Sequence, residues 1–235
     1  MADSLLTGLL AFYRNNGTDR SGNGNTLTAE GSPGTTTGIG GVAGAAASMG
    51  DSKGWVITPP IITVYPYTVN VWANSENVGS AGFSPWSQVD ITDIYQQLLK
   101  IISDPAVEFS TGNGAAGISG GVPDPEVWFM LTATATGSVN GVLTVYLNSV
   151  KLAQQSFANT VAFGPEHETY WGKFSGDADF SSQFLGMWGR VLSDGGVSVG
   201  QAATAGSEIA RLYNSGNGMD PTTEPNIGSG VLIFR

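Results

Sequence analysis

The sequence predicts an all-β protein built from short strands and many turns. Glycine occurs 34 times in 235 residues, about twice its usual share of ~7%, and it favours turns over long helices. Charged residues make up 12% of the chain, against ~25% in an average soluble protein. Several segments alternate apolar and polar residues with the period of a β-strand. A chain of this length can form one sandwich with a sizeable core, so we expect a single domain over residues 1–235, with 219–235 as a C-terminal strand extension.

Late in the chain, an expected strand is followed by an expected short helix. Residues 184–193 predict the strand, because bulky residues alternate with glycines that let another backbone approach closely. Residues 207–218 predict the helix, with Ser207 as its N-cap and Gly216 or Gly218 ending it. The apolar face of this helix contains Ile209, Leu212 and Tyr213.

These elements, together with the opening segments Gly8–Tyr13 and Asp19–Asn25, resemble the two ends of a laminin-G-like domain. That family belongs to the concanavalin A-like lectin and glucanase jelly-roll class. The segment Val145–Ser149 resembles the Tyr-Val-Asn-Gly hairpin of the family, with Ser149 in place of the usual glycine. The resemblance implies an all-β, two-sheet antiparallel jelly-roll sandwich. It does not determine function, because one fold carries many functions.

The chain opens with an expected strand over residues 5–13 and a loop over 14–25. The loop carries oxygen-bearing side chains spaced like a small calcium loop, and the weak metal candidates are Asp19, Asn23 and Asn25. Only Asp19 is a carboxylate, and no bidentate Glu follows it. A structural turn is therefore favoured over a Ca²⁺ site, since Asn and Gly are common in turns. We expect no other cofactor.

Residues 30–54 and 67–74 predict strands of two kinds. The first segment is almost entirely Gly, Ala, Ser and Thr, which indicates weak, closely packed strands or, alternatively, a flexible segment. The second alternates cleanly, with Trp72 on one face. Trp72 is either a sugar platform or covered by a loop, and we favour the loop. The opposite face contains Tyr67, Val69, Val71 and Ala73.

Residues 90–102 depart from the family, which has a short hairpin at this place. Acidic residues precede an apolar stripe at helical spacing, and Asp104-Pro105 follows it. The pattern predicts an inserted amphipathic helix that caps the sandwich or docks another subunit. The stripe consists of Ile91, Ile94, Tyr95, Leu98 and Ile102.

Further strands are expected on either side of a turn at Asn140-Gly141, which is a strong hairpin signal. The outgoing strand covers residues 127–136 and the return strand 143–147. A last strand is expected at 231–234. It would close the sheet within the chain or join a neighbouring subunit, because a bare apolar edge strand promotes aggregation.

The expected loop 163–179 holds the most varied ionisable side chains. Glu166 and Glu168 flank the only histidine, His167, and could bind a metal or act as acid and base. The glucanases of this fold carry a Glu-x-Asp-x-x-Glu strand, whereas no Glu of this chain has Asp two positions later. We therefore expect no catalytic residues and a protein that is not an enzyme.

Sugar binding would use aromatic rings that stack on the faces of sugar rings. The candidates for carbohydrate binding are Trp171, Tyr170 and Trp86.

Composition excludes several classes of partner. Nine Lys and Arg residues against 19 Asp and Glu residues give a net charge of −10, and no basic run occurs. Nucleic acid and anionic membranes are therefore not expected as partners. The absence of cysteine excludes disulfides and thiolate metal sites. The first residues lack the pattern of a secretory signal.

Three functions remain open at this stage. The first is a non-catalytic structural or decoration protein of a virus (phage) particle, located on the virion surface. Its partners would be other structural subunits in a homo- or hetero-oligomer, and it could adhere to host glycans. The second is a free, extracellular carbohydrate-binding module. The third is a glycoside hydrolase that uses Glu166 and Glu168.

Overall fold

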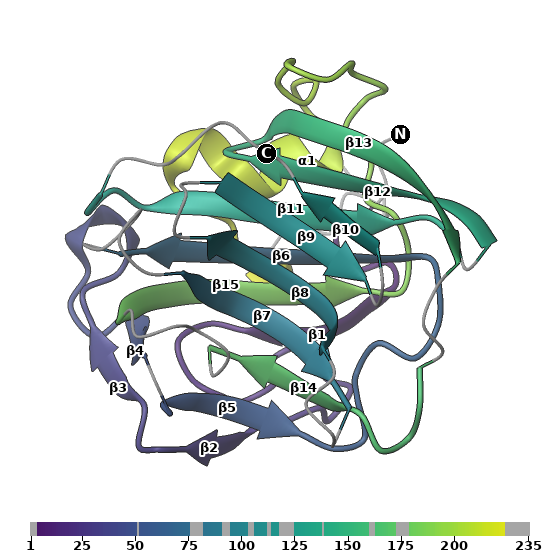
Figure 1. The fold of residues 1–235 in the computed structure, drawn as a ribbon. Helices are drawn as coiled ribbons and strands as arrows, with labels where there is room; N and C mark the ends of the chain where they lie inside the picture. The colour runs from purple at the N-terminus through teal and green to yellow at the C-terminus, as the bar shows by residue number, and fades with distance from the viewer. Residues whose placement is uncertain are drawn as a thin grey trace, which may run out of the picture.

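Two antiparallel β-sheets pack face to face as a sandwich (Figure 1). The computed structural model describes residues 4–50, 52–75, 82–90, 95–102, 106–111, 114–117, 125–137, 139–159, 163–172 and 179–223. The predicted two-sheet antiparallel sandwich is confirmed. Helices are short: α1 (Glu208–Tyr213) and the 3-10 turns η1 (Ile39–Gly41), η2 (Asn214–Gly216) and η3 (Pro221–Thr223). Over these residues, no helix has the length and apolar character needed to cross a bilayer.

The larger sheet, called the β6 sheet here, has eight strands among the described residues. Its order is β13-β12-β11-β6-β15-β4-β3, and β1 pairs with β15 outside that order. The strands are β1 (Leu9–Tyr13), β3 (Gly34–Thr36), β4 (Ala46–Met49), β6 (Tyr67–Asn74), β11 (Phe129–Ala135), β12 (Val139–Leu147), β13 (Val150–Asn159) and β15 (Phe180–Trp188). The strand predicted at 67–74 is thus confirmed. The strand predicted over 184–193 is confirmed only for 184–188, because β15 begins earlier, at Phe180, and ends at Trp188. Strand β15 pairs with β6, β4 and β1.

The smaller sheet, called the β7 sheet here, has seven strands in the described part of the chain. Its order is β10-β9-β8-β7-β14-β5-β2. The strands are β2 (Thr28–Glu30), β5 (Gly54–Ile57), β7 (Phe83–Val89), β8 (Tyr95–Ile102), β9 (Ala106–Thr111), β10 (Gly114–Gly117) and β14 (Glu168–Trp171). The small-residue segment 30–54 therefore does contain weak strands, divided between the two sheets. Strand β14 lies where the sequence predicted only a loop.

The main core lies between the two sheets. One face of β6 points into it with four fully buried side chains, as its alternation predicts. The β7 sheet contributes large aromatic residues from the opposite side, and Phe83 stacks on Phe180 with ring centroids 4.7 Å apart. The four β6 residues are Tyr67, Val69, Val71 and Ala73.

A second core covers the outer face of the β6 sheet. Trp72 and Trp188 point into it from adjacent strands, and α1 supplies Ile209 and Leu212. Tyr213 stacks on Trp72 with centroids 5.8 Å apart and parallel rings, which leaves Trp72 1% exposed. The predicted helix and its apolar face are confirmed, and Trp72 is covered rather than free to bind sugar.

The end of α1 differs in detail from the expectation. The helix stops at Asn214, which adopts left-handed φ and ψ angles of 46° and 47°. Asparagine tolerates this conformation better than most residues, so the helix ends before Gly216. Ser207 occupies the N-cap position with extended backbone, but its side chain makes no capping hydrogen bond.

The predicted inserted helix at 90–102 is wrong, because residues 95–102 form strand β8. The buried residues follow a period of two: Gln97, Leu99 and Ile101 are all at most 1% exposed. Gln97 accepts a hydrogen bond from the Tyr67 hydroxyl inside the core. The predicted helical stripe included Leu98 but not Gln97. The Gln97 amide can be buried because the Tyr67 hydroxyl gives it a hydrogen bond. Residues 91–94 lie outside the described part of the chain.

Strand pairing confirms the two hairpins, but the turn predicted at Asn140-Gly141 is wrong, because both residues lie within strand β12. Strands β11 and β12 pair with Ala135 opposite Leu143. Between β12 and β13, Asn148 and Ser149 both have positive φ angles, 49° and 67°, as the tightest hairpin turns require. Ser149 therefore adopts the left-handed backbone that glycine favours in such turns. The expected strand at 231–234 lies outside the described residues.

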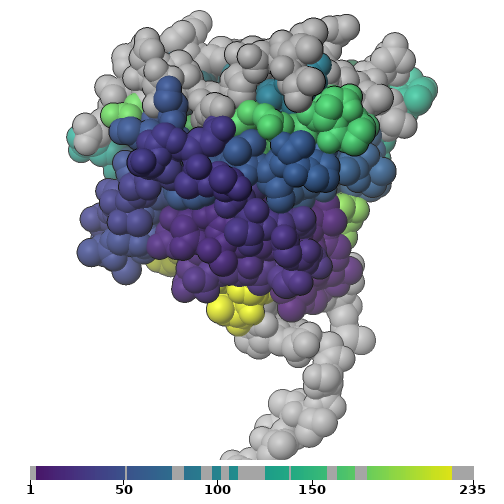
Figure 2. All heavy atoms as spheres, turned by 90° about the horizontal axis from the view of Figure 1, so that it is seen from below, coloured from purple at the N-terminus to yellow at the C-terminus, as the bar shows by residue number. Residues whose placement is uncertain are grey.

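Hydrogen bonds and ion pairs connect the N-terminal residues to residues near the end of the described chain. Arg190 donates hydrogen bonds to the backbone oxygens of Thr7 and Ser4 and forms a two-pronged ion pair with Glu208 of α1. Arg14 lies 3.6 Å from Asp220. Figure 2 shows this side of the molecule, where the N-terminal segments in purple and dark blue form a continuous surface beside the yellow C-terminal residues.

We predict that Ile209→Ala destabilises the protein by about 2–5 kcal/mol, because the side chain is fully buried beneath α1. Chemical denaturation measures this. The control is Val199→Ala, which truncates a side chain that is 54% exposed and should change the free energy of unfolding by less than about 0.5 kcal/mol. Equal effects of the two substitutions would contradict the packing of α1 against the β6 sheet.

Candidate functional site

The candidate site begins at one register position that runs across four neighbouring strands of the β6 sheet and carries polar side chains on three of them. Gly34 of β3 pairs with Ser48 of β4, Ser48 pairs with Ser181 of β15, and Ser181 pairs with Asn74 of β6. Residues at one register position point to one face of a sheet. Their neighbours Ala47, Met49, Ala73 and Phe180 belong to the main core, so the row lies on the outer face.

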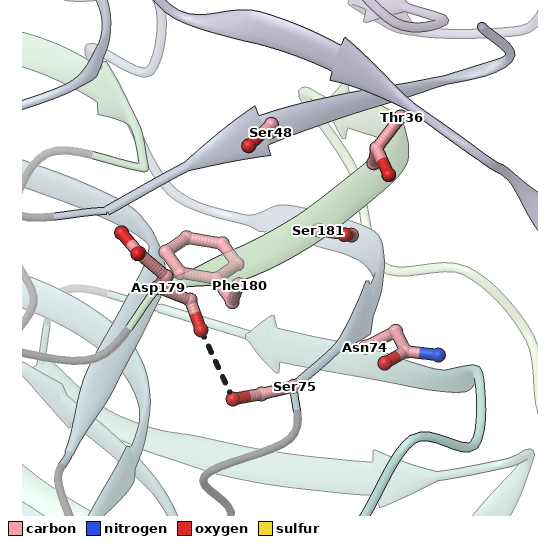
Figure 3. A pocket seen from close by; sticks show the side chains of 7 residues that line it. All are labelled: Thr36, Ser48, Asn74, Ser75, Asp179, Phe180 and Ser181. Atoms are coloured by element: carbon pink, nitrogen blue, oxygen red, sulfur yellow. Dashed lines mark hydrogen bonds between the residues drawn. The ribbon is translucent and has the colours of Figure 1, made fainter.

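A pocket of about 320 Å³ lies over this row. Figure 3 shows Ser48 and Thr36 on one side and Asn74 and Ser75 on the other. The described lining residues are Thr36, Ser48, Asn74, Ser75, Asp179, Phe180 and Ser181. All except Phe180 are polar, and the Phe180 ring is turned into the main core, where it is 4% exposed. The pocket therefore offers polar groups to a ligand and little apolar surface.

Three hydroxyl groups of the pocket make no hydrogen bond to other described residues. They belong to Thr36, Ser48 and Ser181, all partly exposed. Each hydroxyl can donate one hydrogen bond and accept two. The Asn74 side-chain nitrogen donates to the backbone oxygen of Glu126 at 2.8 Å, which holds the amide in place and leaves its oxygen as an acceptor.

Asp179 supplies the only charge among the described lining residues. Its side chain is exposed, and its backbone oxygen accepts a hydrogen bond of 3.2 Å from the Ser75 hydroxyl (Figure 3). The carboxylate lies against Gly50, where a Cβ atom would collide with Oδ1. Gly50 thus makes room for the carboxylate at the edge of the pocket.

The structure corrects the predicted carbohydrate-binding residues. Trp86 and Trp171 are 0% exposed and belong to the main core, and Tyr170 is 5% exposed. Trp171 also donates from Nε1 to the Ser182 hydroxyl at 2.9 Å. A ring stacks on a sugar only if one of its faces is accessible, so these three rings are not stacking platforms in this structure.

The 14–25 loop is held by its own hydrogen bonds. Asp19 Oδ1 accepts from the backbone nitrogens of Phe12 and Ser21, and Oδ2 accepts from that of Asn25 at 2.9 Å. Asn23 and Asn25 each donate a side-chain N–H to the backbone oxygen of Leu10. The favoured structural turn is thus supported, because the carboxylate oxygens face N–H donors. The described residues contain no group of three or more acidic, His or Cys side chains that could hold a metal ion.

Glu166, His167 and Glu168 do not converge. Glu166 is exposed, whereas His167 is buried, and its Nδ1 accepts a hydrogen bond from the Gly164 backbone at 3.0 Å. Glu168, at the start of β14, accepts hydrogen bonds from the hydroxyls of Thr58 and Tyr170. His167 and Glu168 are thus engaged in local hydrogen bonds, and Glu166 faces solvent. These three side chains do not form a paired acid and base.

A second cluster of ionisable side chains links the loop after β15 to the β12–β13 hairpin. Asp194 accepts from Lys151 at 2.7 Å and from the Tyr146 hydroxyl at 2.8 Å. Burial alone would raise the pKa of Asp194, but the hydrogen bonds from Lys151, the Gly196 backbone and Tyr146 outweigh it and lower that pKa. Burial and the neighbouring Asp194 raise the pKa of Tyr146. The cluster is fully paired, so we assign it a structural role.

The sequence alone did not predict the polar pocket. Its residues come from the segments 34–48, 74–75 and 179–181, which carry ordinary Ser, Thr and Asn side chains. Only the register of β3, β4, β15 and β6 brings them together. A weak signal did exist, because polar residues alternate with the core residues Ala47, Met49, Ala73 and Phe180.

No protein-family model matches the chain, and no curated protein is similar to it. Solved structures are similar in fold. The binding domain of botulinum neurotoxin serotype D/C VPI 5993 has a TM-score of 0.65 at 16% identity, covering 90% of this chain and 53% of that one. The serotype C1 binding domain has a TM-score of 0.63 at 13% identity, with 89% and 52% covered. The neurotoxin DC binding domain in complex with SialylT has a TM-score of 0.65 at 15% identity, with 90% and 52% covered.

The chain spans about half the length of these binding domains. At such identities the similarity establishes only the fold, a β-sandwich that also occurs in these neurotoxin binding domains. It does not transfer a ligand or a binding residue.

We predict that Asp19→Ala destabilises the protein by about 1–3 kcal/mol, because several N–H and O–H donors lose their acceptor. Millimolar calcium or a chelator should leave the melting temperature of the unsubstituted protein unchanged. Thermal denaturation with and without calcium measures both effects. A clear rise in melting temperature with calcium would show that the loop binds the ion.

We also predict that Lys151→Met destabilises the protein by about 1–3 kcal/mol near neutral pH, because Asp194 loses a charged partner. The folded pKa of Asp194 is lowered, so its contribution to stability is present above its unfolded pKa of about 3.9 and disappears as pH falls through the folded value. The difference in the free energy of unfolding between the two proteins, measured by urea denaturation, should therefore shrink as the pH falls below the unfolded pKa of about 3.9. A difference independent of pH would mean that Lys151 acts through packing alone.

Proposed function

We propose that this chain is a non-catalytic, lectin-like binding protein that holds a hydroxyl-rich ligand, such as a glycan, in the polar pocket of the β6 sheet. The observation that carries the proposal is the set of hydroxyls of Thr36, Ser48 and Ser181, which lie together in one pocket and make no hydrogen bond to other described residues. Such groups can each give and accept hydrogen bonds, as sugar hydroxyls do.

Two further observations support this proposal. The Asn74 amide is already oriented by Glu126, so little side-chain entropy is lost when a ligand binds. Among proteins of similar fold, one binding domain was solved in complex with SialylT and another in complex with rat synaptotagmin II. A sandwich of this shape therefore serves binding in other proteins.

The finer proposal is that the chain acts as a structural or decoration protein of a virus particle and adheres to glycans through this pocket. Its low share of charged residues, 12%, supports contact with neighbouring subunits, because charge is depleted in interface cores. Light scattering of the purified chain tests the assembly part, for which we expect an oligomer. A monomer at all concentrations would remove the support for this part and leave the pocket proposal intact.

We predict that Ser48→Ala and Ser181→Ala each weaken glycan binding about 2–10-fold, since each removes one hydrogen-bonding group from the pocket. A printed glycan array followed by titration calorimetry on the best ligand measures the effect. The double variant should lose most binding while keeping the melting temperature of the unsubstituted protein.

The matched control is Ser156→Ala, which removes an exposed hydroxyl on β13, at the opposite end of the sheet order. This variant should bind like the unsubstituted protein. Binding that survives the double pocket variant unchanged would place the glycan site elsewhere. A glycan array without any retained ligand would contradict the proposal itself.

A further inference from the structure

We infer that the pocket selects glycans without negative charge, and that Asp179 is the residue that rejects sulfated and carboxylated sugars. This inference rests on the proposed function, because it assigns a ligand class to the same pocket.

The described part of the pocket is rich in neutral hydrogen-bonding groups and carries a single charge. Among its described lining residues, four hydroxyls and one amide oxygen accompany the Asp179 carboxylate, and no Lys, Arg or His takes part. No described cation forms an ion pair with Asp179, and no described donor binds its carboxylate oxygens. An ionised carboxylate accepts hydrogen bonds and donates none, so Asp179 is suited to receive the hydroxyls of a ligand.

The position of Asp179 makes this charge effective on a bound ligand. Its backbone is held by the Ser75 hydroxyl at 3.2 Å (Figure 3). The side chain lies against Gly50. Gly50 forms an isolated antiparallel bridge with Lys53. A larger residue at Gly50 would push the carboxylate away, so glycine is a positioning residue for Asp179.

Charge then decides between ligands of the same shape. A sulfate or carboxylate in this pocket would face Asp179 without any compensating cation among the described lining residues, and like charges in one site repel each other. The acidic balance of the whole chain, −10, adds to the repulsion over longer distances. A protonated amino group in place of a sugar hydroxyl would instead pair with Asp179 through a charge-assisted hydrogen bond.

The test uses sets of glycans that differ only in charge. We would print disaccharides of glucose, galactose, mannose and N-acetylglucosamine in three forms: neutral, with one amine in place of a hydroxyl, and with one sulfate. At low ionic strength, for every disaccharide retained, the sulfated form should bind at least about tenfold more weakly than the neutral form. The amine form should bind at least as tightly as the neutral one. Salt should reduce both differences, because screening weakens exposed charges.

Two variants connect this preference to Asp179. Asp179→Asn keeps the shape of the side chain and removes its charge, so the ratio between neutral and sulfated ligands should fall towards one. Gly50→Ala keeps the charge but displaces it, so the same ratio should fall while the melting temperature changes little. Comparing the binding ratios of the two variants separates the effect of where the charge lies from the effect of having a charge. Ser156→Ala again serves as the control and should keep the full ratio.

The outcomes distinguish this inference from the function on which it rests. Sulfated glycans that bind as tightly as neutral ones, or a ratio that survives Asp179→Asn, would overturn the charge selection but leave glycan binding standing. An array without any retained glycan would overturn both. Binding that ignores Ser48→Ala and Ser181→Ala would move the site away from this pocket and likewise overturn the role of Asp179.

Discussion

The pairing of β6 with β15 fixes the rest of the structure, because both faces of these two strands are used. On one face, Val69 and Val71 of β6 and Met187 of β15 enter the core between the sheets. On the other, Trp72 and Trp188 enter the core under α1. Side chains alternate along a strand, so a shift of one residue would exchange the two sets. Two apolar cores of different shape therefore specify one register.

A bulge in β15 lets the same strand serve two surfaces. The pairing with β6 shifts between Gln183 and Gly186, and Phe184 has a φ angle of 56° in this interval. Phe180 faces the main core before the bulge, and Met187 faces it afterwards. Because the bulge changes which residues point outward, Ser181 ends in the polar pocket and Trp188 ends beneath α1. Bulges commonly redirect side chains near functional sites.

Much of the fold could be predicted from short patterns, but pairings between distant segments could not. Strand 67–74 and the helix beginning at Glu208 followed from alternation and helical spacing, because each buries one apolar face. The helix expected at 90–102 failed because a buried glutamine broke the strand pattern, and only its partner Tyr67 explains that burial. Trp86 and Trp171 were misassigned for a related reason: large aromatic rings more often fill a core than lie open to ligands. The pocket depends on four strands in register, and no single segment reveals it.

The pocket and the composition of the chain are consistent with binding through many weak sites that act together. A few hydroxyls, one amide and one carboxylate can contribute only a few modest hydrogen bonds, because each replaces a bond to water. Little apolar surface is available, since Phe180 is buried in the main core. A single site of this kind binds weakly, and many linked sites bind tightly without any new contact. Glycan binding and assembly into a larger particle would therefore support each other: the particle would supply the copy number that one pocket needs for firm adhesion.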